Sequence, residues 1–245
     1  MTYAMSDIHG HYKFFLLMLE KINFSMGDNL YIIGDVIDRG PYPVACLLDV
    51  MRRPNVTLIL GNHESMMLDS YLRHKGDSLW ALNGSEVTLD GMDCFSDDQQ
   101  EKMIGYLKAC PIVIPDVCVD DRHFYLIHSA PLLRPVKKPV LFAKASEADI
   151  RQAVWSRDFR APGEAERKKY APILKRYKDA RFLIGHTVVQ RTSYGITDEA
   201  HHGRISPVFD GRVLNLDCGC GSGMSLGCLC LDTMEEFYVD AEDVS

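Results

Sequence analysis

The chain has 245 residues, of which 47% are hydrophobic and 25% are charged, and its net charge is −7 at neutral pH. This composition is typical of a folded globular protein and excludes a disordered, collagen-like or coiled-coil chain. The negative charge argues against duplex nucleic acid as the main partner, because phosphate backbones attract basic surfaces. No apolar run approaches the roughly 18 residues that cross a membrane, and the first residues lack a secretory signal. We therefore expect a cytoplasmic protein without a membrane partner.

Eight cysteines are many for this length, and without a secretory signal they favour reduced thiols over disulfides. Four of them form two Cys-X-Cys pairs, a pattern that could indicate zinc: Cys218, Cys220, Cys228 and Cys230. Alternation along SLGCLCLD instead places the last two on one face of an apolar strand, and the usual Cys-X-X-Cys knuckle is missing. We expect buried thiols here, and the sequence leaves their role open.

Three short apolar runs near the amino terminus each end in a polar signature. They are TYAMS before Asp7, LYIIG before Asp35 and VTLILG before Asn62, with helix-like stretches at about 11–22 and 43–53 between them. Roughly 30 residues separate successive runs, which is enough for a strand, a helix and a parallel return strand. Because right-handed crossovers bring the carboxyl ends of parallel strands to one edge of a sheet, the three signatures should converge there.

The rest of the chain predicts helices and then more strands. Residues 64 to about 110 look largely helical, with a Gly-, Asp- and Ser-rich interruption near 83–98, and residues 160–180 look like a charged helix or lid. Five later segments have the apolar pattern of strands: 122–129, 181–187, 212–218, 224–232 and 235–240. We expect these to form a second, partly antiparallel sheet. No linker or repeat divides the sequence, so we expect one domain over residues 1–245 without regulatory appendages.

Five polar motifs follow predicted strands and are rich in Asp, His and Asn. In chain order they are DIH (7–9), GDVIDRG (34–40), GNHE (61–64), HS (128–129) and GHT (185–187). Such oxygen and imidazole donors suit first-row divalent metals better than calcium or a thiolate site. Two divalent ions, two carboxylates and a bridging hydroxide leave a charge of about +1, which favours an incoming phosphate. The motifs therefore predict a dinuclear metal site.

Each motif alone has a simpler explanation. An Asp or Asn at a strand end commonly caps the next helix, which would be sufficient for Asp7 or Asn62. Asp38 and Arg39 could merely form an ion pair in a loop, and Trp-Ser-Arg at 155–157 could be a packing element. Capping does not require a histidine beside every cap, however, so the motifs taken together favour metal binding.

The order and spacing of the motifs resemble the calcineurin-like metallophosphoesterases. Within them the pattern is similar to the phosphoprotein phosphatase family, which includes bacterial and phage serine/threonine phosphatases and symmetrical diadenosine tetraphosphatases. The resemblance extends from Asp7 to about Asp217, with further likeness in LWALNG (79–84), WSR (155–157) and LDCG (216–219). It implies an α/β fold in which two mixed sheets pack as a sandwich flanked by helices.

The resemblance also implies a role for each motif residue. The metal ligands would be Asp7 and His9 on the first ion, Asp35 bridging both ions, and Asn62, His128 and His186 on the second. The catalytic residues would be His63 as the general acid, Asp38 holding it, and Arg39 and Arg157 binding phosphate oxygens. Guanidinium groups match phosphate bidentately, and a metal-bridging hydroxide could attack phosphorus without a protein base.

The implied activity is metal-dependent hydrolysis of phosphomonoesters by direct attack of that hydroxide, with phosphoserine or phosphothreonine in proteins as the first candidate substrate. Two alternatives remain open: cleavage of a dinucleoside tetraphosphate, and a phosphoprotein-binding module that keeps its metal without turnover. Manganese is the first candidate metal, but the ligand set also accepts Fe, Zn or Ni. The oligomeric state stays open, and the long 188–215 loop could select the substrate.

Overall fold

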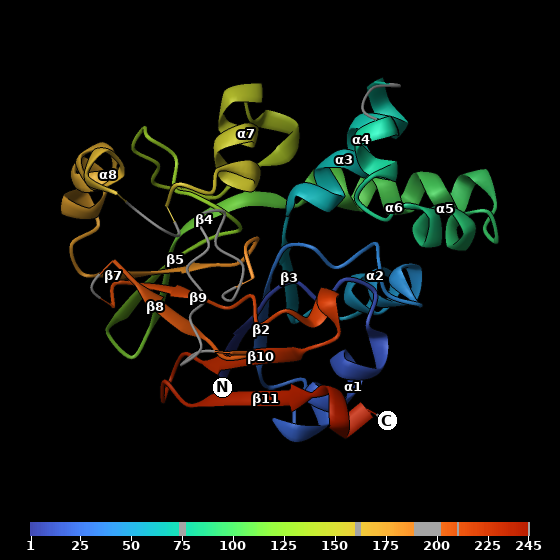
Figure 1. Cartoon of the computed structure of the whole chain (residues 1–245), viewed down its shortest axis with the longest axis horizontal. Helices are drawn as coiled ribbons and strands as arrows, with labels where there is room; N and C mark the ends of the chain where they lie inside the picture. Colours follow the sequence, from blue (N-terminus) through green and yellow to red (C-terminus); the bar gives the residue numbers. More distant parts are fainter. Residues whose placement is uncertain (74–76, 160–162, 189–201, 210, 245) are drawn as a thin grey trace.

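Two mixed β-sheets pack face to face and form the centre of the molecule (Figure 1). The computed structural model describes residues 1–73, 77–159, 163–188, 202–209 and 211–244. In spatial order the first sheet contains β11 (Glu236–Asp240), β10 (Ser225–Cys230), β1 (Thr2–Met5), β2 (Asn29–Ile33) and β3 (Val56–Ile59). The second contains β6 (Val140–Leu141), β4 (Pro111–Val119), β5 (Arg122–Ile127), β7 (Ala180–Ile184), β9 (Val213–Asn215) and β8 (Ser206–Val208). The predicted sandwich is confirmed.

The β1–β3 unit has the predicted βαβαβ arrangement. Strands β1, β2 and β3 pair in parallel, and α1 (Tyr12–Lys21) and α2 (Pro43–Arg52) form the crossovers between them. Successive side chains of a strand point to opposite faces. In β1, Tyr3 and Met5 accordingly pack in the apolar layer that the helices cover, whereas Ala4 packs in the layer between the sheets. Both faces of these strands are therefore buried, and their polar signatures are confined to the strand ends.

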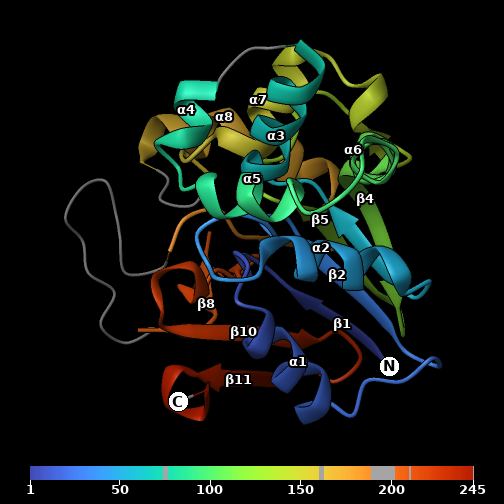
Figure 2. The same ribbon diagram turned by 90° about the vertical axis from the view of Figure 1, so that its right-hand side faces the viewer.

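Helices cover the outer faces of the sandwich (Figure 2). Beside the first sheet lie α1 and α2, and against the second lie α7 (Glu147–Trp155) and α8 (Glu164–Arg176). Four more helices follow β3 in the chain: α3 (Asn62–Arg73), α4 (Asp77–Ala81), α5 (Glu86–Met92) and α6 (Asp97–Ala109). The stretch near 83–98, predicted as an interruption, thus contains the short helix α5. No helix in the described ranges is long and apolar enough to cross a membrane.

The sheet predicted for the two carboxyl-terminal strands was wrong. Segments 224–232 and 235–240 were expected in the second sheet, but β10 pairs antiparallel with β1 and β11 with β10, so both belong to the first. Figure 2 shows the red β10 next to the dark blue β1. All side chains of β10 are buried, because the strand is covered on both faces. Apolar periodicity predicts such a strand but does not specify which sheet edge it joins.

The cysteine pairs lie in apolar surroundings. Cys228 and Cys230 are buried on the same face of β10, as the alternation predicts, and pack in the helix-covered layer with Cys220. Cys218 instead packs in the layer between the sheets. All eight cysteines are free thiols. Among the described residues, the side-chain groups with a metal-binding arrangement contain no cysteine.

Candidate dinuclear metal and phosphate site

The polar motifs converge at the carboxyl edge of the two sheets, as predicted. Asp7 follows β1, Asp35 follows β2 and Asn62 follows β3, while His128 and His186 come from the ends of β5 and β7 in the other sheet. Backbone hydrogen bonds join the strand ends within each sheet. Asp7 N donates to Gly34 O at 3.1 Å and Gly185 N donates to His128 O at 2.8 Å. The site thus spans the junction of both sheets.

The chain reverses sharply at several of these strand ends. Asp7, Asp35 and His186 have φ values of 55°, 56° and 69°, a left-handed conformation that costs a non-glycine residue about 1–3 kcal/mol. Neighbouring glycines leave room for the turned side chains. A Cβ on Gly61 would lie 2.1 Å from Asp35 Oδ1, and a Cβ on Gly185 would lie 2.2 Å from Asp7 Oδ2. The backbone is therefore shaped around the two carboxylates.

Hydrogen bonds to the backbone orient two of the imidazoles. His9 Nδ1 donates to the Ile37 carbonyl at 3.1 Å, and His128 Nδ1 donates to the Ile33 carbonyl at 2.8 Å. Each ring therefore directs Nε2 toward Asp35 Oδ2, at 3.6 Å for His9 and 3.4 Å for His128. Metal-binding histidines are typically fixed in this way, with one nitrogen on a carbonyl and the other free to bind the ion.

Asp35 belongs to both groups of side chains that could hold a metal ion. In each group the donor atoms lie within 4.8 Å of one another, and the groups are His9, Asp35 and His63, and Asp35, His128 and His186. This sharing agrees with a bridging position for Asp35. His63, expected as a proton donor, joins the first group, whereas Asp7 Oδ1 lies 4.0 Å from His9 Nε2.

Asn62 and His186 complete the second group. The Asn62 Oδ1 atom lies 2.7 Å from His186 Nδ1 and 3.1 Å from His128 Nε2. His186 Nε2 is buried without a hydrogen-bond partner. Burying an unpaired polar nitrogen is costly, so an additional ligand for this ring is physically reasonable.

The buried charges also fit metal ions. Burial, together with Asp217 and Asp35 nearby, raises the pKa of Asp7 well above its usual range, and burial raises the pKa of Asp217 to about 6. Burial alone would raise the pKa of Asp35, but the imidazoles of His128 and His63 hold it well below its usual range. Burial would similarly lower the pKa of His128, yet the Asp35 carboxylate raises it to about 10. A buried carboxylate cluster of this kind is stabilised by cations.

His63 and Asp38 form a buried pair next to the donor groups. The His63 Nδ1 atom lies 2.6 Å from Asp38 Oδ2, and both side chains are 0% exposed. Trp80 Nε1 donates to the same oxygen at 2.8 Å, and Thr88 Oγ1 donates to Asp38 Oδ1 at 2.5 Å. Trp80 belongs to the LWALNG motif, whereas Thr88 lies in no recognisable sequence motif.

Glu64 has a role that the sequence did not reveal. Its buried carboxylate accepts backbone N–H bonds from Asp35 at 2.9 Å, Val36 at 2.7 Å and Gly61 at 2.9 Å. It thereby joins the loop after β2 to the turn after β3. The position of Glu64 in GNHE, three residues after Gly61, could have suggested such a contact.

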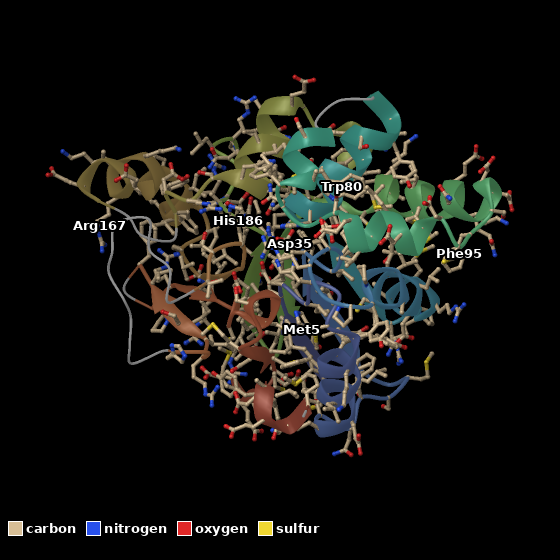
Figure 3. The ribbon with its side chains drawn as sticks, turned by 45° about the vertical axis from the view of Figure 1, so that its right-hand side comes forward. Met5, Asp35, Trp80, Phe95, Arg167 and His186 are labelled. Atoms are coloured by element: carbon tan, nitrogen blue, oxygen red, sulfur yellow. The ribbon has the colours of Figure 1, made fainter. Side chains whose placement is uncertain are left out.

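Two arginines reach the site from different loops. Arg39 donates to His9 Nε2 and to His63 Nε2, both at 3.0 Å. Arg39, Arg157 and His186 line a cleft of about 450 Å³, together with Leu82. In Figure 3, Trp80 and His186 both lie close to Asp35 in the middle of the molecule. The cleft is thus lined by cations beside the donor groups.

Half of the loop expected to select the substrate lies outside the described residues, namely 189–201 and 210 of residues 188–215. Of the described half, Val188 lines the cleft.

The sequence comparisons agree with this geometry. A family model described as calcineurin-like phosphoesterase matches residues 2–190. The chain is 28% identical over 192 residues to serine/threonine-protein phosphatase 2 of Salmonella typhimurium, which covers 78% of this chain and 81% of that protein. It is 26% identical over 159 residues to serine/threonine-protein phosphatase 1 of the same organism, covering 64% and 68%. It is also 38% identical over 84 residues to a symmetrical bis(5'-nucleosyl)-tetraphosphatase of Cellvibrio japonicus, covering 32% of this chain and 31% of that protein.

Solved structures share the fold. A metallophosphoesterase from Sphaerobacter thermophilus superposes with a TM-score of 0.56 at 18% identity, over 98% of this chain and 87% of that chain. A cold-active protein-tyrosine phosphatase of a psychrophilic Shewanella species gives 0.58 at 18% identity, over 100% and 78%. At 18% identity these two matches show only that the fold is shared.

Proposed function

The chain belongs to the calcineurin-like phosphoesterase family, and we propose that it is a phosphomonoester hydrolase acting on phosphoserine or phosphothreonine in proteins. The observation that supports this best is the position of His63. Its Nδ1 atom is bonded to Asp38 while its Nε2 atom lies 3.9 Å from Asp35 Oδ2. His63 is therefore an oriented imidazole next to the proposed ligands, which is the position that a general acid needs. The likeness to serine/threonine phosphatases 1 and 2 supports the same activity.

The donor set fits two divalent metal ions. Asp7 and His9 would bind the first ion, and Asp35 would bind both ions. The second ion would also be bound by Asn62, His128 and His186. When bound, the ions supply a water nucleophile of lowered pKa and positive charge for the phosphate oxygens. We propose Mn²⁺ as the native metal, although a mixed oxygen and nitrogen set also accepts Fe, Zn or Ni. Metal analysis of the purified protein measures both identity and number.

The protein side chains would bind the substrate and supply the proton. Arg39 and Arg157 line the same cleft, and their guanidinium groups would bind phosphate oxygens through paired hydrogen bonds. With Arg39 bound to phosphate and no longer donating to His63 Nε2, the protonated His63 would donate a proton from this atom to the departing oxygen. Asp38 fixes the ring by accepting from Nδ1 and stabilises the imidazolium that carries this proton.

A second candidate is symmetrical cleavage of dinucleoside tetraphosphates. It is supported by the 38% identity to the Cellvibrio japonicus enzyme of that name, although the match covers only 31% of that protein. The same metal ligands would serve both reactions. The difference would lie in whether the cleft accepts a nucleoside or a peptide.

A parallel assay separates these candidates. The purified, Mn²⁺-loaded protein is given a phosphoserine peptide pool and diadenosine tetraphosphate, and kcat/KM is measured for each. We expect the peptides to be hydrolysed more efficiently by orders of magnitude. The reverse preference would establish the second candidate. If the protein binds two ions but hydrolyses neither substrate nor p-nitrophenyl phosphate, the result would favour a phosphoprotein-binding module.

We also propose a cytoplasmic location and a single catalytic domain over residues 1–245. The location is supported by the eight free thiols, which are typical of a reducing compartment. The net charge of −7 supports a substrate other than duplex nucleic acid.

A further inference from the structure

Asp38 and Arg39 have an unusual backbone that other residues must stabilise. Their φ values are 71° and 67°, so two consecutive non-glycine residues are left-handed. This conformation is strained for a non-glycine residue and persists only where its surroundings fix it. The surroundings here are the end of α4, the following turn and the beginning of α5, from Trp80 to Thr88. We call this stretch the 80–88 segment.

The 80–88 segment binds both residues through the main chain. Thr88 Oγ1 accepts the Asp38 N–H at 3.1 Å, and the Gly84 carbonyl accepts the Arg39 N–H at 3.1 Å. Gly84 itself has φ of +89°, and a Cβ on it would lie 3.2 Å from Arg39 Cγ. The turn therefore lies directly against the left-handed pair and satisfies its two main-chain donors.

The same segment fixes the Asp38 side chain. Thr88 Oγ1 donates to Oδ1 at 2.5 Å and Trp80 Nε1 donates to Oδ2 at 2.8 Å, so each carboxylate oxygen has a donor besides His63. All three of these side chains are buried, with Asp38 and Thr88 at 0% exposed and Trp80 at 1%. A carboxylate held at both oxygens has one orientation, and this orientation sets the plane of the His63 ring.

We propose that Thr88 and Trp80 are positioning residues for the reaction, acting through Asp38 on the His63 imidazole. The inference rests on the proton donation proposed for His63. The 80–88 segment keeps the imidazole aimed at the departing oxygen and at the same time holds the backbone that carries Arg39. The side-chain hydrogen bonds of Trp80 and Thr88 between described residues go to Asp38 and not to the donor groups that fit metal, so losing these bonds should affect proton transfer and not metal content.

The test removes one hydrogen-bonding atom. Thr88→Val keeps the side-chain shape without the hydroxyl, Thr88→Ser restores the hydroxyl, and Thr57→Val is the matched change on β3, away from the site. The hydrolysis rates of two substrates are compared in the presence of Mn²⁺. The leaving group of phenyl phosphate needs a proton, whereas that of p-nitrophenyl phosphate hardly does. We expect Thr88→Val to lose about tenfold in kcat on phenyl phosphate, as for one hydrogen bond to a charged group.

The other variants should follow the same logic. The loss for Thr88→Val on p-nitrophenyl phosphate should be small, and Thr88→Ser and Thr57→Val should resemble the wild type. Trp80→Phe keeps the aromatic ring without its N–H and should repeat the selective loss. Metal content, measured by elemental analysis, should stay the same in every variant. An equal loss on both substrates, a loss of metal, or no rescue by Thr88→Ser would overturn the proposal.

A double-mutant cycle with His63→Asn gives the decisive comparison. A residue that acts only through His63 has nothing left to position once His63 is replaced, so Thr88→Val should cause no further loss on phenyl phosphate in that background. If His63→Asn is selective for the poor leaving group but Thr88→Val adds its full loss to it, only the positioning role is wrong. If His63→Asn itself shows no selectivity, the proposed proton donation fails, and the positioning role fails with it.

Discussion

Strand β5 has a His–Asp pair at each end, and the two pairs differ in burial. At the start of the strand, His123 Nδ1 lies 2.8 Å from Asp116 Oδ1, and the two side chains are 42% and 58% exposed. At its carboxyl end, His128 Nε2 lies 3.4 Å from Asp35 Oδ2, with exposures of 0% and 3%. The exposed pair has the shorter distance. Only the buried pair lies among further donors that could share an ion.

The comparison shows that residue type and distance do not make a site by themselves. Water solvates His123 and Asp116 and screens their attraction, so such a pair contributes little. Around His128, burial disfavours isolated charges, and the Asp35 carboxylate raises the pKa of this imidazole to about 10. The buried end is thus an environment in which bound cations stabilise the surrounding groups.

The largest expected effect comes from replacing the shared carboxylate. Asp35→Asn removes a negative charge that belongs to both donor groups, and it should lower kcat/KM by more than about 100-fold. This loss is larger than the effect of replacing a residue that only hydrogen-bonds to a metal ligand. It should also release much of the bound metal, as measured by elemental analysis. Asp116→Asn is the same chemical change at the other end of β5 and should alter neither. Wild-type turnover with two ions still bound to Asp35→Asn would contradict the dinuclear assignment.

The two histidines of β5 should differ in the same way. His128→Asn should reduce the metal content from two ions per chain toward one and lower activity, because it removes one ligand of the second ion. His123→Asn should keep two ions and full activity. Metal titration by calorimetry measures the number of sites, and a loss of metal in His123→Asn would remove the distinction between the two ends.

A smaller and more selective effect is expected for His63, which lies between the ligands and the 80–88 segment. His63→Asn should impair phosphoserine hydrolysis more than p-nitrophenyl phosphate hydrolysis by up to about 10²-fold, because only the alkoxide leaving group needs a proton. Steady-state kinetics on both substrates provide the measurement. A loss of metal in this variant would instead show that His63 is a metal ligand. This result would agree with the position of His63 in the first donor group.

The smallest effect concerns the exposed pair alone. The hydrogen bond to Asp116, followed by its charge and those of Asp179 and Asp121, raises the pKa of His123 above its usual value. This pair stabilises the fold fully when the pH is below the pKa that His123 has in the unfolded chain. The stabilisation is lost as the pH rises through the raised pKa of His123 in the folded chain. Asp116→Asn should therefore shift the His123 titration to lower pH, which NMR of the imidazole protons can follow. An unchanged titration would mean that the pair does not persist in solution.

Much of the site could be predicted because its ligands follow parallel strands. The ends of β1, β2 and β3 meet at one edge by topology alone, so Asp7, Asp35 and Asn62 were predictable as neighbours. His128 and His186 were predicted as site residues through the family pattern. Their approach to the first sheet depends on how the second sheet packs, which no local pattern specifies.

Other features were missed because their signal is not local. Pro111–Val119 forms the long strand β4 but received no prediction, and Ser206–Val208 was expected to belong to the 188–215 loop but forms β8. Strands β10 and β11 were recognised but assigned to the wrong sheet. Thr88 stabilises a loop that lies far from it in the sequence, and a lone Thr in a helix has no pattern that predicts such a contact. Glu64 has a local contact with Gly61, but its bonds to the loop after β2 are also distant in the sequence.

The sequence by itself determined the family, the two-sheet fold class, the strand ends that carry polar residues and the set of Asp, His, Asn and Arg side chains at the site. The strand ends follow from residue type, spacing and the two-residue alternation of strands, whereas the two-sheet fold class was implied by the family resemblance of the motifs. Only the tertiary structure decided that β10 joins β1, that His63 joins the first donor group, and that Trp80 and Thr88 hold Asp38. Those contacts join distant parts of the chain, so they depend on how the sheets and helices pack together and not on local sequence preference.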